Sequence, residues 1–122
     1  MANDNWGFFV EELTCQIPEI IGVQILTIDG LTLWDGIQSS GDDRLSALTA
    51  LLSNGAEQLA LCLGAEKGGK GALVCMGETS YAVIRLNQDV VLGIHIHVVV
   101  IPADLMARIH TVLAANSNIF NN

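Results

Sequence analysis

The chain has 122 residues, a length that suits a single domain well below the size at which a hydrophobic core divides. Hydrophobic residues make up 51% of the sequence and charged residues 15%, against a usual charged share of about 25%, so the composition excludes a disordered chain. The formal net charge is -8, which repels nucleic-acid phosphates and anionic lipid heads. We therefore expect one domain over residues 1–122, with frayed ends at 1–4 and 116–122, that binds no nucleic acid and does not insert into a membrane.

The start of the chain and its cysteines predict a cytoplasmic location. Residues 1–6 lack the basic region and apolar core of a signal peptide, and no apolar run reaches the roughly 18 residues that a membrane helix needs. The cysteines, Cys15, Cys62 and Cys75, form no CxxC pair, and each stands in an apolar stretch. We expect them to be buried thiols that pack as small hydrophobic residues in a reducing compartment.

The first third of the chain predicts a helix and a β-hairpin. Apolar residues recur at helical spacing from Trp6 to Ile17, after a capping residue at Asn3 or Asp4, and Pro18 ends the helix. Residues 20–28 are rich in β-branched side chains, and Asp29-Gly30 supplies a turn before residues 31–34 run back.

A polar loop at residues 38–43 leads into a long helix that ends at Leu63, with Gly64 as its C-terminal cap. This helix carries two adjoining apolar stripes, which leave only a narrow polar strip through Ser46, Thr49, Ser53 and Glu57. Because a surface helix of a monomer needs one apolar face, the second stripe suggests a helix that packs on its own sheet and also on another chain. Gly55 and Ala56 suit close helix approach, either to that chain or inside the monomer.

The rest of the chain predicts three strands and a helix. Strand-like runs cover residues 72–76, 81–86 and 90–100, with turns at Gly77-Glu78 and 87–89 between them. Pro102 takes the first position of a last helix. The resulting order, α-β-β-α-β-β-β-α with short turns, predicts an α+β sandwich with an antiparallel sheet.

Residues that could carry chemistry are few. Residues 64–70 match GxxxxGK, but Gly71 stands where a phosphate loop needs Ser or Thr, and the segment joins a helix to a strand in the reverse order. No GxSxG motif is present, and the basic residues are too scattered for a nucleic-acid surface. We expect no catalytic residue, no cofactor and no metal; the alternative is a zinc-dependent site that uses His95 and His97, which point to the same side of one strand.

From about Trp6 to Leu113 the chain resembles the Roadblock/LC7 domain family. The resemblance rests on the segment 17–23 after the first helix, the apolar strand that closes on residues 29–33, and the capped long helix from Asp42 to Leu63. The hairpin at residues 77–85 and the strand at 90–96 continue it. It implies a five-stranded antiparallel sheet, with the long helix on one face and the terminal helices on the other.

The resemblance also implies a dimer, because family members pair their long helices and their third strands in homodimers or heterodimers with another chain of the Roadblock type. An uncovered apolar edge strand favours such pairing on physical grounds as well. On this mapping the expected dimer interface consists of Leu48, Leu51, Leu52, Gly55 and Leu59 of the helix and Leu73, Val74 and Cys75 of the strand.

Family members are regulators and scaffolds of small Ras-like GTPases in signalling, among them bacterial polarity proteins with GTPase-activating function, or light chains of dynein. The resemblance therefore implies a cytoplasmic, non-enzymatic interaction domain that binds a small GTPase and regulates or localises it. It assigns no arginine finger to Arg44 or Arg85, because a GTPase-activating member is expected to act on its partner's own catalytic loop. The alternative is a structural dimerisation module within a motor or scaffold complex.

Overall fold

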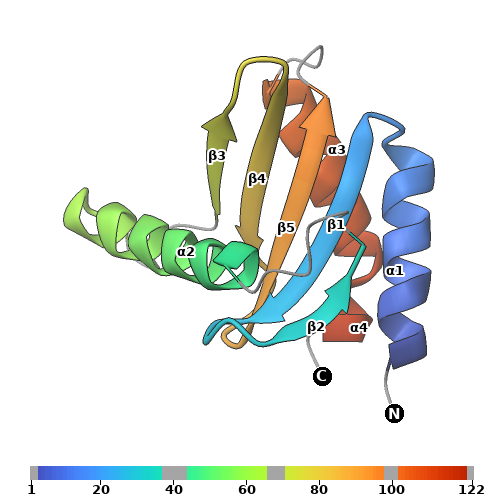
Figure 1. The fold of residues 1–122 in the computed structure, drawn as a ribbon, viewed down its shortest axis with the longest axis horizontal. Helices are drawn as coiled ribbons and strands as arrows, with labels where there is room; N and C mark the ends of the chain where they lie inside the picture. Colours follow the sequence, from blue (N-terminus) through green and yellow to red (C-terminus); the bar gives the residue numbers. More distant parts are fainter. Residues whose placement is uncertain (1–2, 37–43, 66–70, 98–101, 121–122) are drawn as a thin grey trace.

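A computed structural model of the chain describes residues 3–36, 44–65, 71–97 and 102–120. The elements follow the predicted order and add a short helix at the end (Figure 1): α1 (Asn3–Gln16), β1 (Ile20–Thr27), β2 (Thr32–Asp35), α2 (Arg44–Cys62), β3 (Gly71–Cys75), β4 (Thr79–Arg85), β5 (Val90–His97), α3 (Pro102–Ala115) and α4 (Ser117–Phe120). The loop at 38–43 with the helix cap expected at its end, residues 66–70 of the GxxxxGK segment and residues 98–100 of the last strand lie outside what the structure describes, as do the side chains of the cap candidates Asn3 and Asp4.

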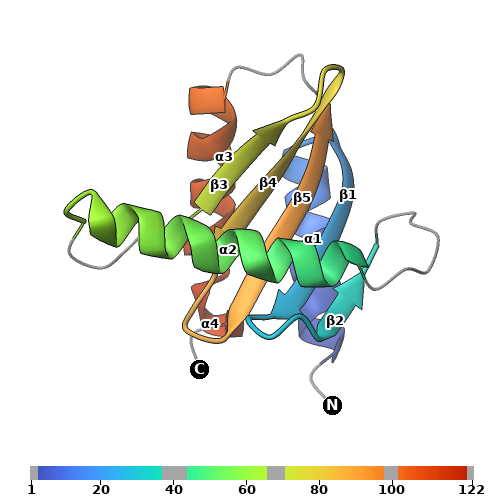
Figure 2. The same cartoon turned by 60° about the vertical axis from the view of Figure 1, so that its left-hand side comes forward.

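The five strands form one antiparallel sheet in the order β2-β1-β5-β4-β3, which confirms the predicted fold class. Figures 1 and 2 show α1, α3 and α4 on one face of the sheet and α2 lying across the other. β5 is the central strand, with β1 and β4 on either side of it, and these three strands lie between the two helix layers. The edge strands β2 and β3 are short.

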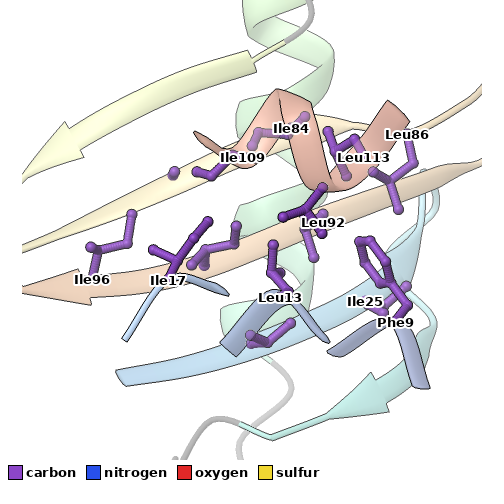
Figure 3. Close-up of a cluster of buried hydrophobic side chains, with 14 of the residues drawn as sticks. Phe9, Leu13, Ile17, Ile25, Ile84, Leu86, Leu92, Ile96, Ile109 and Leu113 are labelled. Atoms are coloured by element: carbon purple, nitrogen blue, oxygen red, sulfur yellow. The ribbon is translucent and has the colours of Figure 1, made fainter. Parts of the chain in front are cut away.

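The main core lies between the sheet and the layer of α1, α3 and α4 (Figure 3). Helix residues such as Phe9, Leu13 and Ile109 contact the strand residues that alternate toward them, such as Ile25 and Ile94, and all five are fully buried. Residues two apart along a strand share one face, so this core takes every second residue of β1, β4 and β5. The strand residues between them face α2, where Leu26, Tyr81, Val83 and Val91 form a smaller cluster with Ala50 of the helix.

Glycine and asparagine residues form the helix cap and the turns at the positions that the sequence predicts. Gly64 has φ of 97°, and the amides of Gly64 and Ala65 donate to the carbonyls of Leu61 and Ala60 at 3.1 and 2.9 Å, which is a Schellman cap. Gly30, in the β1–β2 turn, has φ of 97° as well. The Asn87 side-chain oxygen accepts hydrogen bonds from the amides of Asp89 and Val90 at 2.7 and 2.9 Å, which closes the β4–β5 turn.

Part of the C-terminal end that is expected to fray has regular structure. Within residues 116–122, Ser117–Phe120 form α4, and Asn116 is buried. The side-chain amide of Asn116 donates to the carbonyl of Val112 at 2.9 Å, and Ile119 packs against the main core. These contacts place α4 against the helix layer, and fraying of this end in solution stays a prediction.

An ion pair joins the start of β1 to α3. The guanidinium of Arg108 donates to both carboxylate oxygens of Glu19 at 3.1 and 3.0 Å, and it also lies 3.2 Å from Asp104. The hydrogen bonds from Arg108 lower the pKa of Glu19 below its usual 4.5, so the carboxylate stays charged into mild acid.

Gly93 provides a test of how closely the sheet packs on the α2 side. A methyl group at this position would overlap the hydroxyl of Tyr81, which hydrogen bonds to Thr49. We expect Gly93→Ala to lower the free energy of unfolding by about 1–3 kcal/mol, because Tyr81 must move away from Thr49. Chemical denaturation measures this. Gly7→Ala is the control, because its methyl group would make ordinary contact with Trp34 at 3.8 Å; equal stability of the two variants would contradict the packing described here.

Candidate interaction surface

Helix α2 turns its polar strip toward the sheet and its leucines outward. The residues of α2 that are buried are Ser46, Thr49, Ala50 and Ser53. Three of them belong to the strip that the sequence analysis placed outside the apolar stripes, so that part of the interpretation is corrected. The reason is that the face of the sheet beneath α2 is itself polar at Gln24, Tyr81 and Arg85, and each of these side chains needs a partner.

The hydroxyl groups of α2 supply those partners. Ser46 Oγ accepts a hydrogen bond from Gln24 Nε2 at 2.8 Å and lies 2.7 Å from Thr32 Oγ1. Thr49 Oγ1 lies 2.8 Å from the hydroxyl of Tyr81. Burial raises the pKa of the Tyr81 hydroxyl, so it stays protonated at neutral pH and keeps this hydrogen bond.

Arg85 of β4 holds the middle of α2. Its Nε donates to Ser53 Oγ at 3.1 Å, and one terminal nitrogen lies 2.9 Å from both Asn54 Oδ1 and Glu57 Oε1. The side chain of Arg85 is 17% exposed, so its interactions are partly shielded from water. Together with the hydroxyl pairs, these contacts fix the rotation of α2 about its axis and leave its leucines facing away.

The outward face of α2 is apolar to an unusual degree. Leu48, Leu51 and Leu59 are 59%, 67% and 61% exposed, and Gly55 lies between them with open space beside it. Arg44 and Glu57 are the only charged residues in the sequence of α2. We call these three leucines with Gly55 the leucine face. A contiguous apolar surface of this kind marks an interaction site.

The C-terminal end of α2 extends past the edge of the sheet. Figures 1 and 2 both show its last turns projecting beyond β3, and we call this end of the helix, with residues 59–63, the overhang. The exposed leucines there include Leu61 and Leu63. A groove runs along this overhang between α2 and the start of β3 and is lined by Leu52, Gly55, Ala56, Leu59, Ala60, Leu63, Gly71 and Ala72.

A second groove, of about 360 Å³, continues from Leu52 along the same side of α2, between the first half of the helix and the uncovered part of the sheet. The helix contributes Leu45, Leu48, Thr49 and Leu52, and the sheet side contributes Val74, Met76, Tyr81 and His95. We call this the His95 groove. Its lining is almost wholly apolar, with Tyr81 and His95 as its titratable groups.

The eight residues expected at a dimer interface do not all lie on one open surface. Leu48, Leu51, Gly55 and Leu59 of α2 and Val74 and Cys75 of β3 are exposed. Leu52 and Leu73 are half-buried: Leu52 packs against the cluster beneath α2, and Leu73 points to the opposite face and packs against the main core. The expected interface did not include Met76 or His95, which share the groove with Leu48; alternation along β5 places His95 on the α2 side.

The three cysteines are exposed, which corrects the expectation of buried thiols. Cys15 lies on α1, Cys62 at the end of the overhang, and Cys75 on an edge strand. An apolar stretch does not bury every residue in it when the element has a side that no other element covers. His97 is also exposed, and within the described ranges no three His, Cys, Asp or Glu side chains are placed to hold a metal ion.

No protein-family model matches the sequence, and no curated protein matches it. Solved structures do match. Myxococcus xanthus MglB superposes with a TM-score of 0.81 at 18% identity, over 98% of this chain and 90% of that one. The Roadblock/LC7 domain from Streptomyces avermitilis superposes with a TM-score of 0.77 at 15% identity, over 94% of this chain and 97% of that one. The chain has the Roadblock/LC7 fold.

A further match to this fold is MglB in a tetrameric arrangement, with a TM-score of 0.70 at 16% identity, over 94% of this chain and 89% of that one. The Roadblock/LC7 fold explains why one long helix crosses one face of a five-stranded sheet while the terminal helices cover the other. No helix among the described residues is both long and apolar enough to cross a membrane.

Removal of the Arg85 side chain tests whether the polar contacts orient α2. We expect Arg85→Met to lower the free energy of unfolding by about 2–3 kcal/mol, because Ser53, Asn54 and Glu57 all lose a charged partner. The control is Glu57→Gln, which removes one charge from a side chain that is 33% exposed and should cost about 0.2–1 kcal/mol. Urea denaturation of both variants measures the difference. If Arg85→Met costs no more than Glu57→Gln, the contacts of Arg85 do not hold the helix.

Proposed function

We propose that the protein is a non-enzymatic, dimeric interaction domain that binds a small Ras-like GTPase and regulates or localises it. The observation that carries the proposal is the leucine face, an apolar surface on a helix whose polar side is occupied by its own sheet. The Roadblock/LC7 fold and its likeness to MglB support the class of partner. We assign no catalytic residue, and any change in the rate of hydrolysis would come from the GTPase's own loops.

The dimer follows from two features that lie side by side. In the described part of the sheet β3 is an edge strand, so its outer backbone groups are available to a further strand. Helix α2, which carries the leucine face, extends past the same edge. A two-fold axis perpendicular to the sheet would pair β3 with its copy and bring the two α2 helices together on one face, burying the leucines of both. The tetrameric arrangement of MglB supports association between copies of this fold.

Leu51→Asp tests the dimer. In the monomer this side chain is 67% exposed, so a carboxylate there is hydrated and the fold should persist. In the dimer the same charge would be buried without a partner, and we expect the dissociation constant to rise by about a hundredfold or more. Sedimentation equilibrium measures it, and circular dichroism checks the fold.

The matched control for Leu51→Asp is Phe8→Asp. Phe8 is 70% exposed and lies on α1, on the opposite face of the sheet. It should therefore accept the same charge without any effect on association. A Leu51→Asp protein that remains a folded dimer, or a Phe8→Asp protein that dissociates, would place the interface elsewhere.

The GTPase partner requires a test of nucleotide dependence. We would capture partners from the native extract in the presence of GDP or of a non-hydrolysable GTP analogue, and then purify the retained GTPase. We expect its affinity for the wild-type chain to differ by at least about tenfold between the two nucleotide states, because a regulator must distinguish them. Titration calorimetry with the purified pair measures this. Partners that bind equally in both states, with no GTPase among them, would support the structural dimerisation module instead.

A further inference from the structure

The His95 groove lies in the half of the sheet that α2 leaves uncovered. Figures 1 and 2 show α2 crossing the sheet away from the ends of β3 and β5, where Cys75 and His97 stand. His95 is half-buried there, opposite Tyr81 of β4 and Gly22 of β1. The groove is open on the side away from α2, so in the isolated chain its apolar lining faces water.

The two-fold arrangement proposed above places the second copy over this groove. Rotation about an axis perpendicular to the sheet at β3 puts the partner's α2 over the opposite half of the combined sheet. The two α2 helices are antiparallel in this arrangement. If they approach most closely at Gly55, residues 59–63 of the overhang in one copy lie beside residues 47–51 of α2 in the other copy. The overhang of one copy then lies next to the His95 groove of the other.

The segment that would cover the groove carries no charge. Residues 58–65 are Gln-Leu-Ala-Leu-Cys-Leu-Gly-Ala. The overhang is therefore apolar enough to cover Leu48, Val74 and Met76, but it brings no carboxylate to His95. We propose that the second copy closes the His95 groove with the overhang of α2, and that protonation of His95 therefore weakens the dimer. This inference rests on the proposed dimer and adds a regulation to it.

The groups that face His95 offer little compensation for a positive charge. The groove residues of α2 and those on the β3 side are uncharged, and β1 presents Gly22. β4 presents Tyr81, which stays neutral because burial and the charge of Asp35 raise its pKa, and whose hydroxyl already pairs with Thr49. Asp35 is a carboxylate on this face of the sheet, but it stands on β2, two strands away from β5. On its own strand the neighbouring titratable group on the same face is His97, a like charge when protonated. An imidazolium enclosed by these groups and an uncharged helix would be costly, so the dimer binds fewer protons than two free monomers.

The predicted effect of acid on the dimer is opposite to the effect that the net charge of the protein would have. The chain carries a net charge of -8, so acidification toward the isoelectric point near 4.5 lowers the repulsion between two copies and on that ground favours association. Exclusion of a proton from each of two His95 sites acts the other way. Linkage then requires the logarithm of the dissociation constant to rise as the pH falls, with a slope that approaches about two per pH unit.

The test is the dissociation constant of the full chain, measured by sedimentation equilibrium between pH 8 and 5.5 at constant ionic strength. For the wild type we expect an increase of about tenfold or more across this range, which imidazole titration spans. His95→Gln should dimerise at pH 8 and lose the increase, and His95→Phe provides a second neutral replacement. Two controls are His97→Gln, exposed on the same strand, and His110→Gln, exposed on α3 on the opposite face. Both should keep the wild-type pH dependence.

The outcomes separate this inference from the dimer itself. A wild-type dimer whose dissociation constant does not rise in acid overturns the role of His95 and leaves the dimer standing. The same holds if both His95 variants keep the pH dependence, or if His97→Gln removes it. A chain that is monomeric at every pH overturns the proposed dimer and this inference with it.

Discussion

The rotation of α2 about its own axis is the constraint on which the rest of the surface depends. Hydroxyl groups at Ser46 and Thr49 meet polar side chains of the sheet, and Arg85 binds the next turns of the helix. A polar group buried without a partner costs more than a leucine left in water, so the helix turns its hydroxyls inward. The consequence is an outward row of leucines that the monomer cannot cover. Stability within the chain and the association that we propose between chains thus have one physical origin.

Much of the fold was predictable because its signals are local. Helical spacing from Trp6 to Ile17, the Asp29-Gly30 turn and the cap at Gly64 each involve a few neighbouring residues, and the structure confirms all three. The short turns between the later strands allow only antiparallel neighbours, so the sheet follows from the element order. The order of strands in the sheet was not predicted, beyond the edge position that the family resemblance implies for the third strand, since pairing between β1 and β5 joins residues far apart in the sequence.

The candidate surface was less predictable because it depends on what two elements present to each other. Periodicity identifies the two stripes and the polar strip of α2 but cannot tell which of them meets the sheet. A signal did exist in the sequence: Gln24 stands inside an apolar strand, and Arg85 follows the apolar run of β4, so both need polar partners, which a polar helix face can supply. The exposure of Cys62 and Cys75 was not predictable for the same reason, because burial depends on neighbouring elements. Cys62 is the last residue of α2, and Cys75 is the last residue of an edge strand.

The central claim is that the overhang of α2 and the outer edge of β3 are covered by a second copy. The most direct measurement is amide hydrogen exchange of the wild-type chain, resolved by residue, at concentrations well above and well below the midpoint of association. The account predicts that protection in β3 and in the C-terminal half of α2 rises with concentration, while α1 and α3 exchange at unchanged rates. Association that instead protects α1 and α3, or that leaves β3 unchanged, would contradict it.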